Sequence, residues 1–280
     1  MILKISKYAG FCFGVLRAVE AVFECSDKKI KIFGEIAHNE ILINKLKKNQ
    51  NITFIKDLKE VSSKDTLIIR AHGISLNLID KFNSLGIKII DMTCPKIKLA
   101  YHIAVAAKIN GNQLIIIGDL NHPEIIGIKS RNENAIIISD LDEAEKFVKN
   151  LKLKNQNFIA ITQTTYDNER YLEICNFLKK NLKKIDCKNT ICRDAINRQN
   201  EIRENSKKSD LVIIIGSKIS SNAKKLFDIS SKSCETVLVD DENDFNFEMV
   251  KSKKYIFLCS AASAMKETVN NFITILKQYS

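Results

Sequence analysis

Three cysteines share one local context, each standing directly before a segment of helical periodicity. Cys12 lies between two glycines ahead of the amphipathic run that reaches Phe23, Cys94 precedes Pro95, and Cys192 precedes a third such run. Unpaired backbone N–H groups at a helix N-terminus favour negative charge, so a thiol placed there loses its proton more easily. Such a cysteine acts as a nucleophile or as a metal ligand, and its position alone leaves both interpretations open.

Polar residues also gather where six apolar segments of strand length end. These segments are 31–40, 66–75, 113–124, 157–165, 211–222 and 255–263. Helical patterns lie between them, for example at 41–49, 171–184 and 267–279. Strands that alternate with helices are typical of parallel sheets covered on both faces, and ligands bind beyond the carboxyl ends of such strands. We therefore predict an α/β fold with its functional side chains at these polar ends.

The cysteines and the polar ends together form an internal repeat. The first polar end follows its cysteine by 26, 28 and 28 residues, at His38, His122 and Ser220. A second follows in each copy, at His72, Thr164 and Ser263. We predict three similar α/β domains that face a common axis and a central cleft, at 13–93, 94–191 and 192–280, with the N-terminal strand 1–12 completing the third.

Three thiolates on three helix starts suit a metal centre better than a lone nucleophile. Zinc usually takes closely spaced C-x₂-C pairs, which the chain lacks. Dispersed cysteines can hold an iron–sulfur cluster, because its thiolate ligands need only converge in space. A four-iron cluster held by three cysteines leaves one iron open to a substrate. The alternative is that these cysteines only pack in the core.

Three of the four histidines, and a group of serines, lie at the polar strand ends. His38, His72 and His122, with the hydroxyl and amide groups of "SKISSN", form a set of donors suited to phosphate oxygens. Glu124 is the one carboxylate among them and is placed to carry a proton. The chain has no P-loop and no G-x-G-x-x-G, which argues against a nucleotide. His102, inside a helical pattern, is expected on the helix surface or in packing.

Composition restricts the class of protein. The chain has 280 residues, 45% of them hydrophobic, and a net charge of +11 with scattered lysines, which indicates compositional bias rather than nucleic-acid binding. No apolar stretch has the length of a membrane span, and no signal peptide begins the chain. Eight cysteines without a secretory signal do not indicate a disulfide framework. We predict a cytoplasmic protein with no nucleic-acid and no membrane partner.

Eight short stretches then resemble one family, the LytB (IspH) family of 4-hydroxy-3-methylbut-2-enyl diphosphate reductases. In chain order they are "GFCFGV", "AHNE", "RAHGIS", "DMTCP", "NHPEIIG", "TQTT", "ICRDAINRQ" and "GSKISSN". The resemblance implies a pseudo-threefold trefoil of α/β domains around a [4Fe–4S] cluster. It also implies the last step of the non-mevalonate isoprenoid pathway, in which an allylic hydroxyl is removed reductively to give isopentenyl and dimethylallyl diphosphates.

The resemblance assigns roles by matching motif. The cluster, one per chain with one iron not ligated by protein, takes three ligands: Cys12, Cys94 and Cys192. The diphosphate is held by His38, His72, Ser220, Ser221, Asn222 and Ser263. Around the reacting hydroxyl lie His122, Glu124 and Thr164, with Glu124 supplying protons and Thr165 a weaker candidate. Electrons come from an external donor such as a ferredoxin or flavodoxin.

The chain departs from the family pattern at two places. Ala262 stands where a glycine is usual, with no proline after the motif, and Ala195-Ile196 stand where a threonine is usual. The other cysteines are expected to be structural: Cys25 and Cys175 in helical patterns, Cys187 in a polar turn, Cys234 before a strand and Cys259 in a strand. Two other classes stay open, a zinc-dependent hydrolase that uses three cysteines and a non-catalytic basic binding protein.

Overall fold

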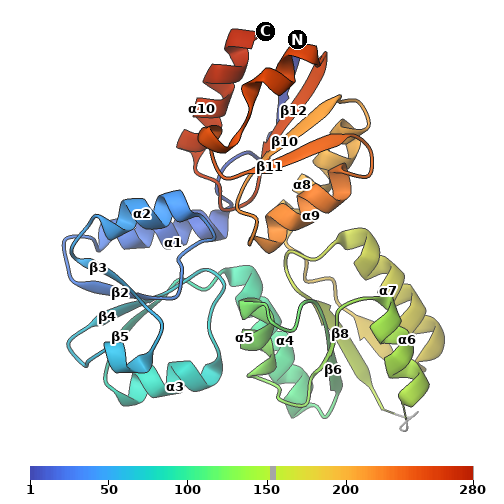
Figure 1. Cartoon of the computed structure of the whole chain (residues 1–280). Coiled ribbons are helices and arrows are strands. Elements are labelled where there is room, and N and C mark those ends of the chain that lie inside the picture. Colours follow the sequence, from blue (N-terminus) through green and yellow to red (C-terminus); the bar gives the residue numbers. More distant parts are fainter. Residues whose placement is uncertain (152–155, 280) are drawn as a thin grey trace. The chain divides into compact units, whose positions relative to one another are not determined.

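Runs of isoleucine, leucine and valine form the strands of three parallel four-stranded sheets with helices, so the fold belongs to the α/β class, as predicted (Figure 1). The computed structural model describes residues 1–151 and 156–279. These form two compact units. The terminal unit comprises residues 1–30, 34–54 and 193–280, and the middle unit comprises residues 31–33 and 55–192. The predicted placement of three domains around a cleft, and their boundaries at 13–93, 94–191 and 192–280, stay predictions.

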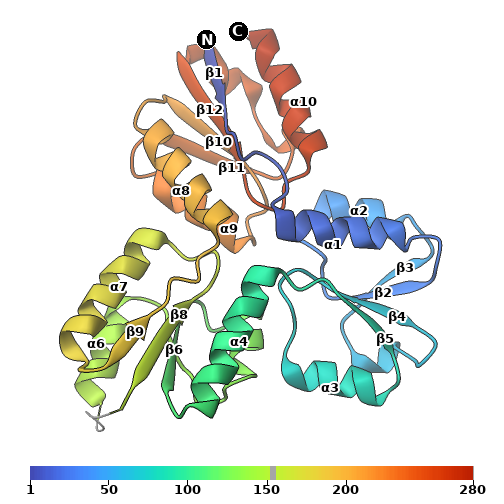
Figure 2. The ribbon, with the colours of Figure 1, turned by 180° about the vertical axis from the view of Figure 1, so that it is seen from behind.

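The terminal unit contains a sheet in the order β1-β12-β10-β11. Its strands are β1 (Ile2–Ile5), β10 (Leu211–Ile215), β11 (Glu235–Val239) and β12 (Tyr255–Ser260). Seen from behind in Figure 2, the N-terminal strand β1 runs beside β12, and the two are parallel with Ile2 opposite Tyr255. The first strand of the chain thus joins a sheet whose other strands come from its last third.

Helices cover both faces of this sheet. Residues of β10 alternate between two cores, because successive side chains of a strand point to opposite faces. Ile213 packs with Phe272 of α10 (Lys266–Leu276), whereas Ile214 packs with Leu226 of α9 (Ser221–Ser230). Ile202 of α8 (Arg193–Ser206) joins the second core. Because both faces of β10 are buried, its residues are all apolar and do not alternate with polar ones.

A second sheet lies in the middle unit, in the order β7-β6-β8-β9. Its strands are β6 (Gln113–Ile117), β7 (Ile136–Ile138), β8 (Phe158–Thr162) and β9 (Ile185–Cys187). Figure 1 shows helices on both sides of it. One side carries α4 (Pro95–Ile109) and α5 (Pro123–Lys129), and the other carries α6 (Leu141–Asn150) and α7 (Asn168–Asn181). Pro95 and Pro123 each take the first helical position, where a missing N–H costs nothing.

The third sheet has the order β3-β2-β4-β5. Its strands are β2 (Ile30–Phe33), β3 (Ile52–Ile55), β4 (Thr66–Ile69) and β5 (Lys88–Asp91), and the helices of this part of the chain are α1 (Phe13–Glu24), α2 (Glu40–Lys47) and α3 (Leu76–Ser84). Short 3₁₀ turns are η1 (Leu58–Glu60), η2 (Glu242–Asp244), η3 (Phe247–Ser252) and η4 (Lys277–Tyr279). Among the described residues, no helix is both long and apolar enough to span a bilayer.

Strand order relates the cysteines to the polar loops in the same way in all three sheets. The two inner strands of each sheet lead into the polar ends, which are those after β2 and β4, after β6 and β8, and after β10 and β12. One edge strand of each sheet leads to a cysteine: β5 to Cys94, β9 to Cys192 and β1 to Cys12. The internal repeat seen in the sequence is therefore a repeat of sheet topology.

Several local expectations need correction. Cys187 is the last residue of β9 and not part of a turn, and Cys25 lies just after the end of α1. The helices α3, α5 and α6, and the strands β3, β7 and β9, were not expected from the periodicity. The three strands have only three or four residues each, which is too short for an alternating pattern to stand out, whereas the amphipathic patterns of α3 and α6 were usable signals. The six expected strands are present but shorter than the apolar segments.

Candidate active site

The middle unit holds a buried carboxyl group, that of Glu124 in the first turn of α5. Glu124 is 1% exposed. Its oxygens accept two hydrogen bonds of 2.7 Å, one from the backbone N–H and one from the hydroxyl of Thr164. Burial raises the pKa of Glu124 to about 7, and the two Thr164 hydrogen bonds limit the rise. The group is thus poised to hold or release a proton near neutral pH.

Thr164 joins this carboxyl group to one of the predicted cluster ligands. Its N–H and hydroxyl bind Glu124, while its carbonyl oxygen accepts the backbone N–H of Cys192 at 2.9 Å. Thr164 follows the inner strand β8, and Cys192 directly precedes α8. One residue therefore fixes the distance between the proton-carrying group and the Cys192 backbone.

Two neighbouring histidines lie in the same unit, and one of them, His122, contacts Glu124. The rings of His72 and His122 meet edge to face with their centroids 5.7 Å apart. His122 caps α5, and its Nδ1 accepts the backbone N–H of Glu124 at 3.3 Å. Because Nδ1 accepts in this contact, a neutral His122 carries its proton on Nε2. The middle unit thus links His72, His122, Glu124 and Thr164, from strand ends far apart in the sequence, through pairwise contacts.

Cys94 lies beside the same group at the start of α4. Burial raises the pKa of its thiol, the Cys192 thiol and the Glu124 carboxyl raise it further, and the backbone amides of Lys96 and Ile97 lower it. Cys94 and Cys192 are therefore electrostatic neighbours, both as free thiols. The helix start does not make the Cys94 thiol more acidic, as was expected from the sequence, because burial outweighs the amides of Lys96 and Ile97. Two neighbouring thiols still suit the ligand set of an iron–sulfur centre. Neither unit, over its described residues, brings three His, Cys, Asp or Glu side chains together as a metal site on its own.

The terminal unit holds the third cysteine. Cys12 caps α1, and its carbonyl oxygen accepts the N–H of Leu16 at 2.9 Å. Its own N–H donates to the carbonyl oxygen of Ala262 at 3.0 Å. The loop that carries Cys12 therefore lies against the loop that follows β12. The departure at Ala262 leaves this contact in place, since it uses the backbone.

Ser263 and His38 also lie side by side in the terminal unit. The Ser263 hydroxyl donates to the carbonyl oxygen of His38 at 3.1 Å. Asn39 donates from its side chain to the carbonyl oxygen of Ser263 at 2.8 Å, and its other amide atom caps α2. Asn39 was not among the predicted site residues, although its place at a helix N-cap was a usable signal.

The loop after β10 carries the remaining predicted diphosphate ligands at the start of α9. Ser220 caps this helix, and its side chain accepts the N–H of Ala223 at 3.4 Å. Ser221 and Asn222 are the first two helical residues. Asn222 is 5% exposed, yet neither atom of its amide group has a hydrogen-bond partner among the described residues. An unpaired buried amide at a helix N-terminus is a ready site for an anion that brings its own acceptor oxygens.

Thr165, the weaker candidate, is bound by a neighbouring side chain. Its hydroxyl accepts a hydrogen bond of 2.9 Å from the side-chain amide of Gln163. The carbonyl oxygen of that amide accepts the N–H of Asp119 at 3.1 Å. Gln163, which was not among the predicted site residues, thus links Thr165 to the loop that carries Asp119. Thr164 and not Thr165 contacts Glu124.

Comparisons with known proteins agree on one family. The chain matches the family described as LytB protein over residues 3–277. It is 34% identical over 279 residues to a 4-hydroxy-3-methylbut-2-enyl diphosphate reductase of Nautilia profundicola, with 99% of each chain covered. It is 35% identical to the protein of that name from Thermoanaerobacter pseudethanolicus, covering 98% of this chain and 96% of the relative.

Two solved structures are also similar. One is the E-1-hydroxy-2-methyl-but-2-enyl-4-diphosphate reductase from Plasmodium falciparum, with a TM-score of 0.92 and 31% identity, covering 99% of this chain and 88% of that one. The other is described as the terminal enzyme of the non-mevalonate pathway. It has a TM-score of 0.71 and 28% identity, and covers 99% of this chain and 100% of that one.

Proposed function

Because this chain belongs to the LytB protein family, we propose that it removes the allylic hydroxyl of 4-hydroxy-3-methylbut-2-enyl diphosphate by reduction. Proteins of this family are iron–sulfur enzymes. The observation that carries the proposal is the chain of contacts from Glu124 through Thr164 to Cys192. It couples a carboxyl group with a pKa of about 7 to the backbone of a cysteine assigned to the cluster.

The cofactor that fits these residues is a [4Fe–4S] cluster, one per chain. Its ligands are Cys12, Cys94 and Cys192, which leaves one iron without a protein ligand. When bound, the cluster supplies electrons and a Lewis acid for the substrate hydroxyl. Support for this ligand set comes from the common position of the three cysteines, each after an edge strand and before a helix.

The diphosphate is held by neutral and histidine donors from the loops after the inner strands. These donors are His38, His72, Ser220, Ser221, Asn222 and Ser263. The unpaired buried amide of Asn222 supports the assignment, since phosphate oxygens would accept its N–H groups. Glu124 is kept away from the diphosphate in this proposal, because a carboxylate and a phosphate repel each other.

Glu124 supplies the proton for the departing oxygen. The allylic C–O bond breaks, two electrons enter from an external donor such as a ferredoxin or flavodoxin, and two protons are taken up. One proton leaves with the oxygen as water, and the other goes to either end of the allyl fragment, which gives isopentenyl and dimethylallyl diphosphates. Thr164 orients the Glu124 carboxyl group through two hydrogen bonds, and His122 lies beside it. A carboxyl group with a pKa near 7 is well matched to this task at neutral pH.

Anaerobic purification and one assay test the proposal. We expect a brown protein with about four iron and four sulfide per chain and little zinc. With a chemical reductant in place of the unknown donor, it should convert the substrate to the two isomers. Zinc alone, with hydrolytic activity, would favour the hydrolase, and a folded, colourless, metal-free chain without turnover would favour the binding protein. A cytoplasmic location stays a prediction.

A further inference from the structure

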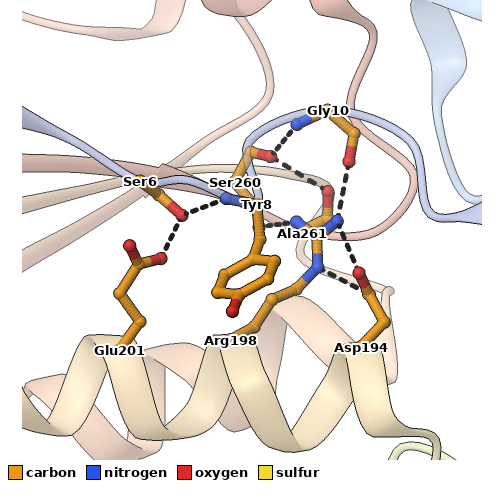
Figure 3. Close-up of polar contacts among 8 residues, drawn as sticks. All are labelled: Ser6, Tyr8, Gly10, Asp194, Arg198, Glu201, Ser260 and Ala261. Atoms are coloured by element: carbon orange, nitrogen blue, oxygen red, sulfur yellow. Dashed lines mark hydrogen bonds and ion pairs between the residues drawn. The ribbon is translucent and has the colours of Figure 1, made fainter.

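Arg198 is a buried arginine that the proposed chemistry does not use. It lies on α8 in the terminal unit and is 4% exposed. Asp194, Arg198 and Glu201 share one face of this helix, as residues four and three positions apart do (Figure 3). Figure 3 shows all three pointing at the chain segment 6–10 and at the end of β12. A buried guanidinium needs full pairing, so its partners indicate what it is built to hold.

The guanidinium of Arg198 donates hydrogen bonds to two separate loops. One terminal nitrogen donates to the carbonyl oxygen of Ser260 at 2.9 Å, and the other donates to the carbonyl oxygen of Gly10 at 3.0 Å. Its Nε donates to Asp194 at 2.7 Å, which fixes the plane of the group. The planar guanidinium holds its N–H groups in fixed directions and so binds two carbonyl groups at once. A lysine ammonium in its place has no such fixed pair of donors.

The two loops carry residues assigned to the cofactor and to the substrate. Gly10 lies two residues before Cys12, and Ser260 lies three residues before Ser263. They are also joined directly, since the Gly10 N–H donates to the Ser260 hydroxyl at 2.8 Å and the Cys12 N–H donates to Ala262. Arg198 is the side chain that pairs both carbonyl groups of this junction.

The segment before Cys12 needs such a tether. Gly10 has a φ of +106°, in the region that glycine adopts most readily. A glycine has the most backbone freedom to lose, and Gly10 has no side chain to pack. Glu201 holds the same segment farther from Cys12, where it accepts the Ser6 hydroxyl and the Lys7 N–H.

We propose that Arg198, oriented by Asp194, is a positioning residue that holds the Cys12 loop (residues 8–12) against the Ser263 loop (residues 260–263). It keeps a cluster ligand and a diphosphate-binding serine at a constant spacing. The roles of Cys12 and Ser263 in this inference rest on the proposed function, whereas the tether between the two loops does not.

Amide hydrogen exchange on the cluster-free chain tests the tether alone. The variants are Arg198→Gln and Arg198→Lys, with Asp194→Asn as a milder change and Glu201→Gln as the matched control. We expect faster exchange at Gly10 and Cys12, and throughout residues 260–263, in both Arg198 variants. Glu201→Gln should accelerate exchange at Lys7 and leave Cys12 protected. Unchanged protection of both loops in folded Arg198 variants would overturn the inference. Should neither Arg198 variant fold, unchanged protection in Asp194→Asn would do so.

The loaded protein then tests what the tether is for. In Arg198→Gln we expect cluster loss to a chelator to be faster by about 10-fold and KM for the substrate to rise by a similar factor, the scale of one lost charge-assisted hydrogen bond. Arg198→Lys should fall between wild type and Arg198→Gln, and Glu201→Gln should match wild type in both measurements. A purely structural role would lower Tm in Arg198→Gln without moving either quantity. A wild-type chain that lacks cluster and turnover would count against the proposed function, while the exchange result would still decide the tether.

Discussion

Two buried polar groups, the Glu124 carboxyl group of the middle unit and the Asn222 amide of the terminal unit, have opposite environments. In the middle unit, the Glu124 carboxyl group accepts two hydrogen bonds from Thr164, and Thr164 in turn accepts from Cys192. In the terminal unit, the equally buried amide of Asn222 has no partner among the described residues. A group that moves a proton must be oriented in advance, whereas a group that binds an anion keeps its donors unpaired until the anion arrives. We call the Glu124 and Thr164 pair the chemical half of the proposed function and the Asn222 amide the binding half.

Substitution of a proposed cluster ligand should have the largest effect. Cys192→Ser should abolish an intact cluster, and with it all turnover, because only three protein ligands hold it. Cys187→Ser, five residues earlier at the end of β9, should leave the cluster content near that of wild type. Iron and sulfide analysis with visible absorption of anaerobically purified protein checks both variants. Loss of the cluster in Cys187→Ser but not in Cys192→Ser would transfer the ligand role to Cys187.

Glu124→Gln tests the chemical half. Glutamine keeps the shape and accepts hydrogen bonds, but it delivers no proton to the departing oxygen. We expect kcat to fall by about 100-fold or more, with cluster content and substrate affinity near wild type. Steady-state kinetics with a chemical reductant measures this. Near-normal kcat would remove Glu124 from the proton path and leave His122 or a bound water in its place.

Asn222→Ala tests the binding half, and Thr164→Val is its counterpart. Removal of the unpaired Asn222 amide should weaken binding of substrate and product alike, by about 10-fold, without lowering the stability of the cluster-free chain. Thr164→Val instead removes a hydrogen bond to a buried carboxyl group, so the free energy of unfolding should fall by about 1–3 kcal/mol. Calorimetric binding and denaturant unfolding of both variants measure these quantities. Equal losses of stability in the two variants would erase the distinction between the halves.

The pH dependence of stability gives the smallest and most specific effect. Burial raises the pKa of Glu124 from 4.5 to about 7, so between these values the folded chain binds a proton that the unfolded chain has lost. The free energy of unfolding should therefore decrease as pH rises through this window, by about 1 kcal/mol per pH unit. Urea unfolding of the cluster-free chain at pH 5, 6 and 7 measures this slope. In Glu124→Gln the free energy of unfolding should fall less steeply with pH, by about 1 kcal/mol per pH unit. Equal slopes would mean that Glu124 titrates at its ordinary pKa.

Local pattern in the sequence determined the positions of the candidate groups along the chain. Cys12 and Cys94 cap helices, α8 begins directly after Cys192, and His38, His72 and His122 follow inner strands, as predicted. Helix starts and strand ends are set by residues within a few positions of each other, which is why a sequence reveals them. The family resemblance, carried by eight short stretches in order, added the reaction.

Tertiary structure alone decided the contacts that give these groups their properties. Glu124 and Thr164 are 40 residues apart in the chain, and only the pairing of β6 with β8 brings their loops together. Gly10 and Arg198 are 188 residues apart and meet because the first strand joins the last sheet. A sequence shows which residues can ionise or donate a hydrogen bond. Folding decides which groups surround them, and these groups raise the pKa of Glu124, leave the Asn222 amide unpaired and give Arg198 its two carbonyl partners.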